Sequence, residues 1–377
     1  MKTRRAIILL TILLFISGFN YARQLPSKME VLEQMKLTNA YFMNKWPDPG
    51  KEIVIEKTRA SNIWTRAVYY EGLMALYQIN PDKEYYNYAV NWGNAHHWGL
   101  NDGIKTRNAD NYCCGQTYLD LYMIDKKAER ISNLKASVDL MMQSSKINDW
   151  NWIDALQMSM PVFAKLGVLY NDNRYFERMY QMYMYTKTTE GGKGLYNPED
   201  KLWWRDKDFV PPYKEPNGED CYWSRGNGWV VATFVRVLEI LPKDAPHRDE
   251  YQNTLKQMME ALIPIQRKDG FWNVSLHDPK NYGGKELTGT ALFTYAMAWS
   301  INNGILDKEK YLPVINKAWN AMSKESVQPN GFLGYVQGTG KQPSDSQPVT
   351  SNRVPNFEDY GLGCFLLAGS EVYKLCD

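Results

Sequence analysis

Residues 287–303 read LTGTALFTYAMAWSINN and contain no charged side chain. Small residues (Thr, Gly, Ala, Ser) are mixed with large apolar ones (Leu, Phe, Tyr, Met, Trp), so a helix over this stretch has no charged face. A helix that is small or apolar around most of its circumference is buried on several sides. The sequence therefore predicts an interior helix here, with packing neighbours all round it.

Further segments along the chain repeat this design. Most are followed by a short polar turn and then by a helix with charges on its outer face, as Lys308–Lys324 follows residues 287–303. The starts of the interior segments lie 43 to 72 residues apart, which indicates a degenerate repeat of helix hairpins. The other interior segments are Asn62–Ile79, Asn111–Ile124, Asp154–Tyr170, Arg225–Leu241 and Asp359–Tyr373.

Six interior helices, each paired with an outer one, predict an all-α fold, an (α/α)6 barrel of six helix hairpins. An open α-solenoid is the alternative, but the inner helices are too apolar to line a solvated concave face. A helix over Lys28–Trp46 is expected to pack on the outside and complete the sixth hairpin. Because no Ser/Gly-rich linker interrupts the pattern, residues 23–377 are predicted to form a single catalytic domain.

Composition excludes several classes of protein. The chain has 377 residues, is 44% hydrophobic and 14% aromatic, and balances 44 Lys+Arg against 42 Asp+Glu. That content excludes wholesale disorder and argues against nucleic acid as a partner. The five cysteines and four histidines show no metal-ligand spacing, so neither a metal nor a cofactor is predicted. One long-range disulfide among Cys221, Cys364 and Cys376 stays open.

The first 22 residues are predicted to be a signal peptide. A positively charged start (residues 1–5) precedes a nearly pure aliphatic run (6–15) and then small and polar residues (17–22). An uncleaved anchor is the alternative, although the apolar run is short for a bilayer span. We therefore expect an exported protein, periplasmic or extracellular, that has no membrane attachment after cleavage. The sequence does not indicate an oligomeric state.

Acidic residues, an arginine and tryptophans gather at the starts of the interior helices. Because parallel inner helices begin at the same end of the barrel, these residues should share one cup, with helix N-termini that favour anions. An anionic sugar fits such a cup: Trp covers its apolar face, Arg pairs with its carboxylate and Asp transfers protons. The residues are Asp110, Trp150, Trp152, Asp154, Trp223, Arg225, Trp229, Glu286 and Asp359.

Each of these residues also has a purely structural interpretation. Aspartate at a helix start is commonly an N-cap, which applies to Asp110 and Asp154. The tryptophans could be core residues, Arg225 could be a structural ion-pair partner, and Glu286 could be a surface charge beside Lys285. Capping alone explains less well why acid, arginine and tryptophan occur together at successive helix starts.

Four motifs resemble glycoside hydrolase family 105, the unsaturated rhamnogalacturonyl hydrolases and their relatives. They are Trp152-Ile-Asp154-Ala-Leu, Trp223-Ser-Arg-Gly-Asn-Gly-Trp229, the stretch Glu286–Phe293 and the stretch Tyr360–Ser370. The resemblance covers essentially the whole chain after residue 22. It implies an (α/α)6 barrel without a metal that acts on oligosaccharides with a 4,5-unsaturated uronic acid at the non-reducing end.

The resemblance also assigns roles to individual residues. The family's catalytic aspartate falls on Asp154 and a second family aspartate on Asp110, while substrate-holding residues fall on Trp223 and Arg225, with Trp152 and Trp229 close by. It implies that Asp154 protonates C4 of the C4=C5 double bond. Water then adds at C5, and the resulting hemiketal opens and expels the neighbouring sugar.

The chain departs from the family pattern at one place. Some members carry a histidine upstream of the catalytic aspartate, whereas residues 144–151 contain none. This leaves the identity of the sugar open. The alternatives are an unsaturated glucuronyl hydrolase that acts on glycosaminoglycan fragments and a non-catalytic carbohydrate-binding protein on the same barrel.

Overall fold

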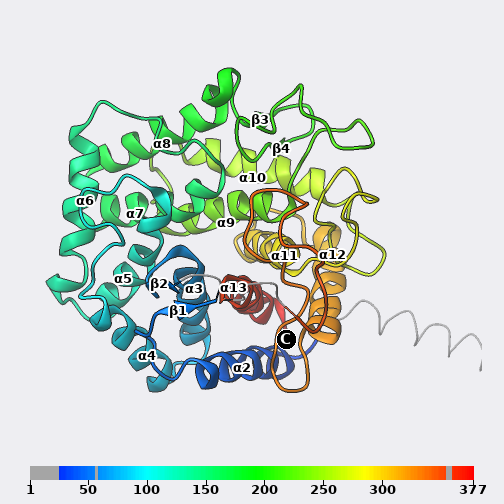
Figure 1. Ribbon diagram of the computed structural model, residues 1–377, viewed down its shortest axis with the longest axis horizontal. Helices are drawn as coiled ribbons and strands as arrows, with labels where there is room; N and C mark the ends of the chain where they lie inside the picture. The colour runs from blue at the N-terminus through cyan, green and yellow to red at the C-terminus, as the bar shows by residue number, and fades with distance from the viewer. Residues whose placement is uncertain (1–24, 56–57, 354–358) are drawn as a thin grey trace, which may run out of the picture.

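The computed structural model describes residues 25–55, 58–353 and 359–377, so the predicted signal peptide (1–22) lies outside the described residues. Six inner helices pack side by side in a ring in which α13 returns to α3 (Figure 1). Their bounds agree with the predicted interior segments to within two residues, and the ring is closed, so the open solenoid is wrong. The inner helices are α3 (Trp64–Ile79), α5 (Cys113–Ile124), α7 (Asp154–Tyr170), α9 (Ser224–Ile240), α11 (Leu287–Asn302) and α13 (Asp359–Leu375).

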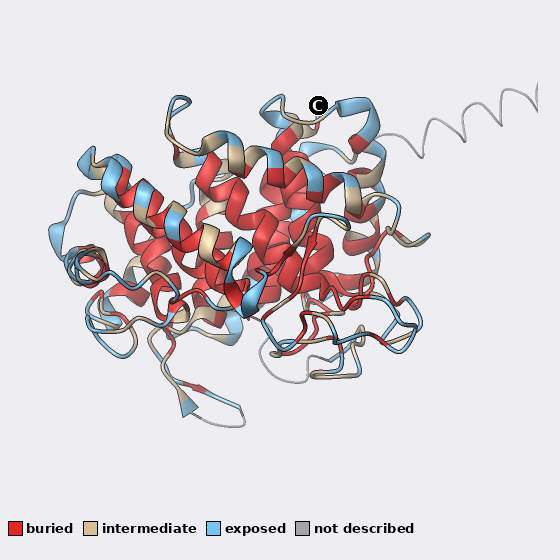
Figure 2. Ribbon diagram, turned by 90° about the horizontal axis from the view of Figure 1, so that it is seen from above, coloured by how far each residue is buried: buried red, intermediate tan, exposed pale blue. Residues whose placement is uncertain are grey.

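Outer helices surround this ring and make the fold an (α/α)6 barrel, as predicted. The N-terminal helix α2 packs against α13 and completes the sixth hairpin. Figure 2 shows the buried residues concentrated in the central helices and the exposed ones on the surrounding helices and loops. The outer helices are α2 (Lys28–Lys45), α4 (Lys83–Ala95), α6 (Ser132–Gln143), α8 (Asn173–Thr188), α10 (Arg248–Leu262) and α12 (Lys308–Ala321).

The remaining regular structure is short and lies in the loops. Strand β1 (Ile53–Val54) pairs antiparallel with β2 (Thr58–Arg59), and β3 (Tyr196–Asn197) pairs antiparallel with β4 (Leu202–Trp203). The described residues also contain four short helical turns: η1 (Ala109–Tyr112), η2 (Ala128–Arg130), η3 (Glu190–Gly192) and η4 (Met322–Ser326). The five cysteines are free and buried. Within the described part of the chain, no helix is long and apolar enough to cross a membrane.

The small residues of the inner helices allow the ring to close. A Cβ atom on Gly72 of α3 would lie 2.6 Å from the carbonyl oxygen of Gly363 on α13, and one on Gly363 would lie 2.1 Å from the carbonyl oxygen of Val68. At the same seam the Nε of Arg66 lies 2.5 Å from Oδ2 of Asp359, and both side chains are buried. Close backbone approach and a buried ion pair therefore join the last inner helix to the first.

Candidate active site

A single pocket at one end of the barrel is lined by residues from the second halves of all six inner helices. The six inner helices therefore run parallel. Their starts consequently meet at the opposite end. Asp154 is the first residue of α7, and Asp110 lies in η1, immediately before α5. The two aspartates that the sequence singled out thus lie at the same end of the barrel.

The segment before α7 is held in place by hydrogen bonds to other parts of the chain. The N–H of Ile153 donates to the carbonyl of Arg205 at 2.9 Å, and the hydroxyl of Thr186 donates to the carbonyl of Trp150 at 2.5 Å. Trp152 forms an isolated antiparallel bridge with Asp206. These contacts fix the position of Asp154 at the end of the barrel where the inner helices begin.

The side chain of Asp154 does not cap its helix. Helix α7 has no side-chain cap, and Oδ2 of Asp154 instead accepts a hydrogen bond from Nε of Arg205 at 3.0 Å. The carboxylate is 10% exposed, so it is nearly buried but open to a small molecule on one side. The simple N-cap interpretation is therefore wrong for this residue.

Asp110 forms an electrostatically coupled pair with Asp154. Burial, and then the negative charge of Asp154, raise the pKa of Asp110 to about 7, although the positive charge of Arg205 acts in the opposite direction. The residue that caps this turn is Asn108, whose side chain accepts from the N–H of Asp110. Asp110 therefore keeps a proton close to neutral pH, a property that acid–base catalysis uses.

Arg205 is a site residue that the sequence analysis missed. Besides the contact with Asp154, its Nη1 donates to Oδ2 of Asp206 at 2.7 Å. Its Nη2 has no hydrogen-bond partner in the described ranges, and the side chain is 20% exposed. Arg205 follows β4 instead of opening an inner helix, so the search for polar residues at helix starts passed over it.

A pocket of about 270 Å³ adjoins this arginine. Trp152 contributes a half-buried ring to its wall, and its predicted place beside the substrate stays a prediction. The wall is strongly charged, with Arg205, Lys207 and Lys341 as cations. The complete lining is Asn151, Trp152, Glu190, Arg205, Asp206, Lys207, Asp208 and Lys341.

The surroundings of Arg225 and its neighbours are buried in this structure. Trp223, Arg225 and Trp229 are at most 1% exposed, so none of them offers a surface to a ligand in this arrangement. The Nη1 and Nη2 of Arg225 donate to the carbonyls of Gln337 and Gly338 at 2.7 and 2.8 Å. Backbone carbonyls take the place of the alternative ion-pair partner, and the predicted pair with a substrate carboxylate stays a prediction.

These buried residues hold the loop that carries Lys341. Trp223 donates from Nε1 to Oε1 of Gln337 at 2.9 Å, and Gln337 in turn donates to the carbonyl of Asp345 at 2.8 Å. The guanidinium of Arg225 is sandwiched between the rings of Trp223 and Tyr360, 4.5 and 4.9 Å from their centroids. Trp223 and Arg225 therefore fix the loop that carries Lys341 from the buried side of the site.

Two further expectations can be compared with the structure. Glu286 is fully buried and caps α11, where it accepts from the N–H groups of Thr288 and Gly289, so its interpretation as a surface charge is wrong. Within residues 25–55, 58–353 and 359–377, no group of three or more His, Cys, Asp or Glu side chains is arranged to hold a metal ion.

A family model, named relatives and solved structures that are similar to this chain all include glycoside hydrolases. The model of the family described as Glycosyl Hydrolase Family 88 matches residues 34–376. A Formosa agariphila protein named unsaturated 3S-rhamnoglycuronyl hydrolase is 33% identical over 83% of this chain and 84% of its own length.

Solved structures are similar over nearly the whole chain. A glycosyl hydrolase family 88 protein from Bacteroides vulgatus is 31% identical, with a TM-score of 0.84 over 93% of this chain and 99% of its own. Another, named a polysaccharide lyase, is 30% identical, with a TM-score of 0.84 over 92% of this chain and 98% of its own.

Proposed function

The chain belongs to glycosyl hydrolase family 88 and its family 105 relatives, and from this membership we propose which of its residues perform the reaction. It is an unsaturated uronyl hydrolase, a glycoside hydrolase that removes a 4,5-unsaturated uronic acid from an oligosaccharide. The observation that carries the assignment of residues is the coupled pair of Asp110 and Asp154, which holds a proton near neutral pH. From residues 1–22 we also infer that the protein is exported.

In the proposed mechanism the acid pair supplies a proton to C4 of the substrate. The C4=C5–O5 group is a vinyl ether, so protonation at C4 leaves positive charge shared between C5 and the ring oxygen. Asp154 donates this proton, and its carboxylate then takes a proton from the water that adds at C5. The hemiketal formed at C5 opens and releases the neighbouring sugar, which leaves Asp154 protonated for the next cycle.

Arg205 is the cation best placed to bind the substrate carboxylate. Its Nη2 is free in the described part of the chain, whereas both Nη atoms of Arg225 are occupied by carbonyls. A guanidinium binds a carboxylate through charge-assisted hydrogen bonds. When the uronate engages Arg205, this guanidinium is shared between the substrate and Asp154, and the proton that Asp110 carries in the free enzyme is the one that Asp154 passes to C4.

The pocket beside Arg205 is the proposed site for the rest of the oligosaccharide. Its wall carries three cations and three carboxylates, with Lys341 paired to Asp208 at 3.3 Å, so it offers polar groups of both signs to a sugar chain. The half-buried ring of Trp152 supports contact with a sugar face. The Formosa relative's name joins rhamnose to the glycuronyl group, and this similarity supports a rhamnose-linked uronate as the substrate.

The test follows the double bond by its ultraviolet absorbance. Oligosaccharides made by lyase digestion of rhamnose-containing polyuronides and of glycosaminoglycans are offered in parallel. Loss of absorbance with the rhamnose-containing set is the expected result, and loss with glycosaminoglycan fragments alone would favour a glucuronyl hydrolase. A gain of absorbance on undigested polysaccharide would indicate a lyase, the activity in the name of one similar structure. No change would leave a binding protein.

Substitution of Arg205 should separate its charge from its geometry. We expect Arg205→Lys to lower kcat about tenfold, because the charge stays but the fork that orients Asp154 is lost. Arg205→Gln should additionally move the alkaline fall in activity to higher pH, since the charge of Arg205 lowers the pKa of Asp110. Arg174→Lys, which alters an exposed Arg–Asp pair on α8, is the matched control. Unchanged kcat and pH profile in both Arg205 variants would contradict the role.

Arg225→Lys should mainly destabilise the protein. It removes the two paired donations to the carbonyls of Gln337 and Gly338, and we expect the free energy of unfolding to fall by about 1–3 kcal/mol. The wild type should discriminate against the methyl ester of the substrate, and the variant should keep this discrimination. If the variant loses it, Arg225 binds the carboxylate directly, as the resemblance implies.

A further inference from the structure

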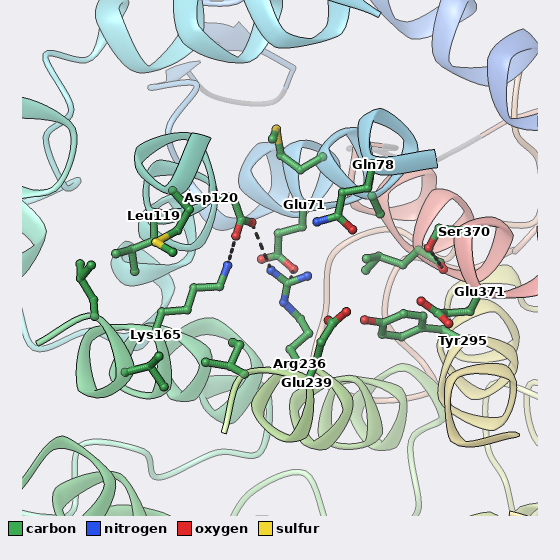
Figure 3. A pocket seen from close by; sticks show the side chains of 17 residues that line it. Glu71, Gln78, Leu119, Asp120, Lys165, Arg236, Glu239, Tyr295, Ser370 and Glu371 are labelled. Carbon is green, nitrogen blue, oxygen red and sulfur yellow. Dashed lines mark hydrogen bonds and ion pairs between the residues drawn. The ribbon is translucent and has the colours of Figure 1, made fainter. Parts of the chain in front are cut away.

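A second pocket lies at the opposite end of the barrel from Asp154, where the inner helices end. It encloses about 320 Å³, and all six inner helices contribute side chains to its wall (Figure 3). The C-terminal ends of helices carry partial negative charge. The backbone alone therefore makes this end of the barrel attractive to cations, whereas the active-site end favours anions.

The side chains of the wall add to this negative charge. Lys165 pairs with Asp120, and Nε of Arg236 lies 3.6 Å from Oε2 of Glu71, so these cations are already matched by carboxylates (Figure 3). Two further carboxylates, those of Glu239 and Glu371, belong to the wall. Its charged groups are Glu71, Asp120, Lys165, Arg236, Glu239 and Glu371.

Glu371 is matched by Lys374, which leaves Glu239 as the carboxylate without an ion pair. Glu371 accepts from Nζ of Lys374 at 2.6 Å and from Nδ2 of Asn302 at 2.8 Å. Glu239 has no ion pair or hydrogen bond among the described residues. Glu239 is an exposed residue. Desolvation, and then the negative charge of Glu371, raise its pKa, whereas the positive charges of Arg236, Lys374 and Lys165 act in the opposite direction. Glu239 thus faces the pocket without a cation of its own.

Tyr295 is a second, independent indication of a ligand. It is 3% exposed, its hydroxyl has no hydrogen-bond partner in the described part of the chain, and Figure 3 shows this hydroxyl pointing into the pocket beside Glu239. The hydroxyl is not one of the fully enclosed atoms, so it presents an unpaired oxygen to whatever occupies the pocket. The rest of the wall is apolar and suits an alkyl group: Met74, Met123, Val168, Leu169, Ile240 and Leu367.

We propose that this pocket binds a small organic ammonium ion. The ammonium group donates to the carboxylates of Glu239 and Glu371 and to the hydroxyl oxygen of Tyr295, and the alkyl part packs on the apolar wall. A bare metal ion fits less well, because no carboxylate cluster with metal-binding geometry occurs in the described ranges and much of the wall is apolar. This site is separate from the hydrolase site and does not depend on its activity.

Calorimetric titration of the whole protein tests the charge preference of the pocket. The probes are n-hexylammonium, 1-hexanol and hexanoate, which share a chain length and differ in the charge of the head group. We expect saturable binding of n-hexylammonium with a Kd of about 1 mM or tighter, and binding of the other two at least about tenfold weaker. Equal binding of the alcohol, tighter binding of hexanoate, or no saturable binding of the ammonium would overturn the proposal.

Variants locate the binding within the pocket. Glu239→Gln should weaken n-hexylammonium binding about tenfold, and Tyr295→Phe should weaken it several-fold, because each removes one acceptor. Glu33→Gln makes the same charge change at an exposed position on α2 and should leave the affinity unchanged. Hydrolase activity should persist in all three. An affinity that falls equally in Glu33→Gln, or not at all in Glu239→Gln, would show that the ammonium binds elsewhere.

Discussion

Asp154→Asn should lower kcat by at least about a hundredfold and leave KM and the unfolding transition nearly unchanged. The amide keeps the shape of the carboxyl, and its oxygen can still accept from Nε of Arg205, but it cannot deliver a proton to C4. Acid–base groups typically contribute about 10²–10⁴-fold. A rate loss confined to kcat is the signature of an interaction used only in the transition state.

Asp206→Asn is the matched control for this variant. Its carboxylate is as exposed as that of Asp154, at 10%, and both pair with the same arginine. We expect Asp206→Asn to cost less than about tenfold in kcat, because it disturbs Arg205 without removing the transferred proton. Steady-state kinetics on one unsaturated oligosaccharide compares the two. If Asp154→Asn retains more than a tenth of the wild-type kcat, or if the two variants are equally impaired, Asp154 is not the proton donor.

The barrel could be predicted from sequence because its inner helices differ from ordinary amphipathic ones. A helix such as α11 has no charged face, so it must be surrounded, and six such helices with alternate partners close most simply into a ring. The glycines that bring α3 and α13 together at Gly72 and Gly363 belong to the same pattern. The pattern of small and apolar residues can be recognised within each helix alone. In this fold the same pattern also indicates which helices pack together in the ring.

The site was only partly predictable, because its residues come together through loops. Asp110 and Asp154 were found because helix starts share one end of a barrel of parallel inner helices. Arg205 lies 51 residues from Asp154 and follows a two-residue strand, a position for which no periodic pattern gives an orientation. The only local feature of the sequence that could have drawn attention to Arg205 is its position beside Asp206, directly after two tryptophans.

Contacts with distant parts of the chain explain why the burial of Arg225 and of Glu286 was not predicted. The carbonyls that satisfy Arg225 come from residues more than a hundred positions later, so its burial could not be inferred from its own surroundings in the sequence. Glu286 follows a lysine, which suggested an exposed pair. In the structure that lysine pairs with Glu325, while Glu286 turns inward to cap α11. Lys285 and Glu286 are neighbours in the sequence, but they have different partners in the structure.

Asp110→Asn should remove the alkaline fall in activity and lower kcat by about a hundredfold. In the wild type the pKa of Asp110 is about 7, so the acid pair loses its shared proton as the pH rises through neutrality, and kcat/KM should fall with an apparent pKa near that value. Asparagine cannot titrate, so the step near pH 7 should be absent. An unchanged profile would mean that a different group controls the alkaline limb.

The same substitution should stabilise the protein at pH 8, which distinguishes a catalytic role from a structural one. A carboxyl whose pKa is raised on folding stabilises the folded state below its unfolded pKa of about 4, and this contribution is lost as the pH rises through about 7. Above pH 7 the wild type thus bears a penalty of roughly 2–4 kcal/mol for an ionised Asp110, and Asn removes it. Urea unfolding at pH 5 and pH 8 measures the difference. Because a structural residue would lose stability on substitution, a variant that is less stable at pH 8 as well as less active would show that Asp110 holds the fold together and does not store the proton.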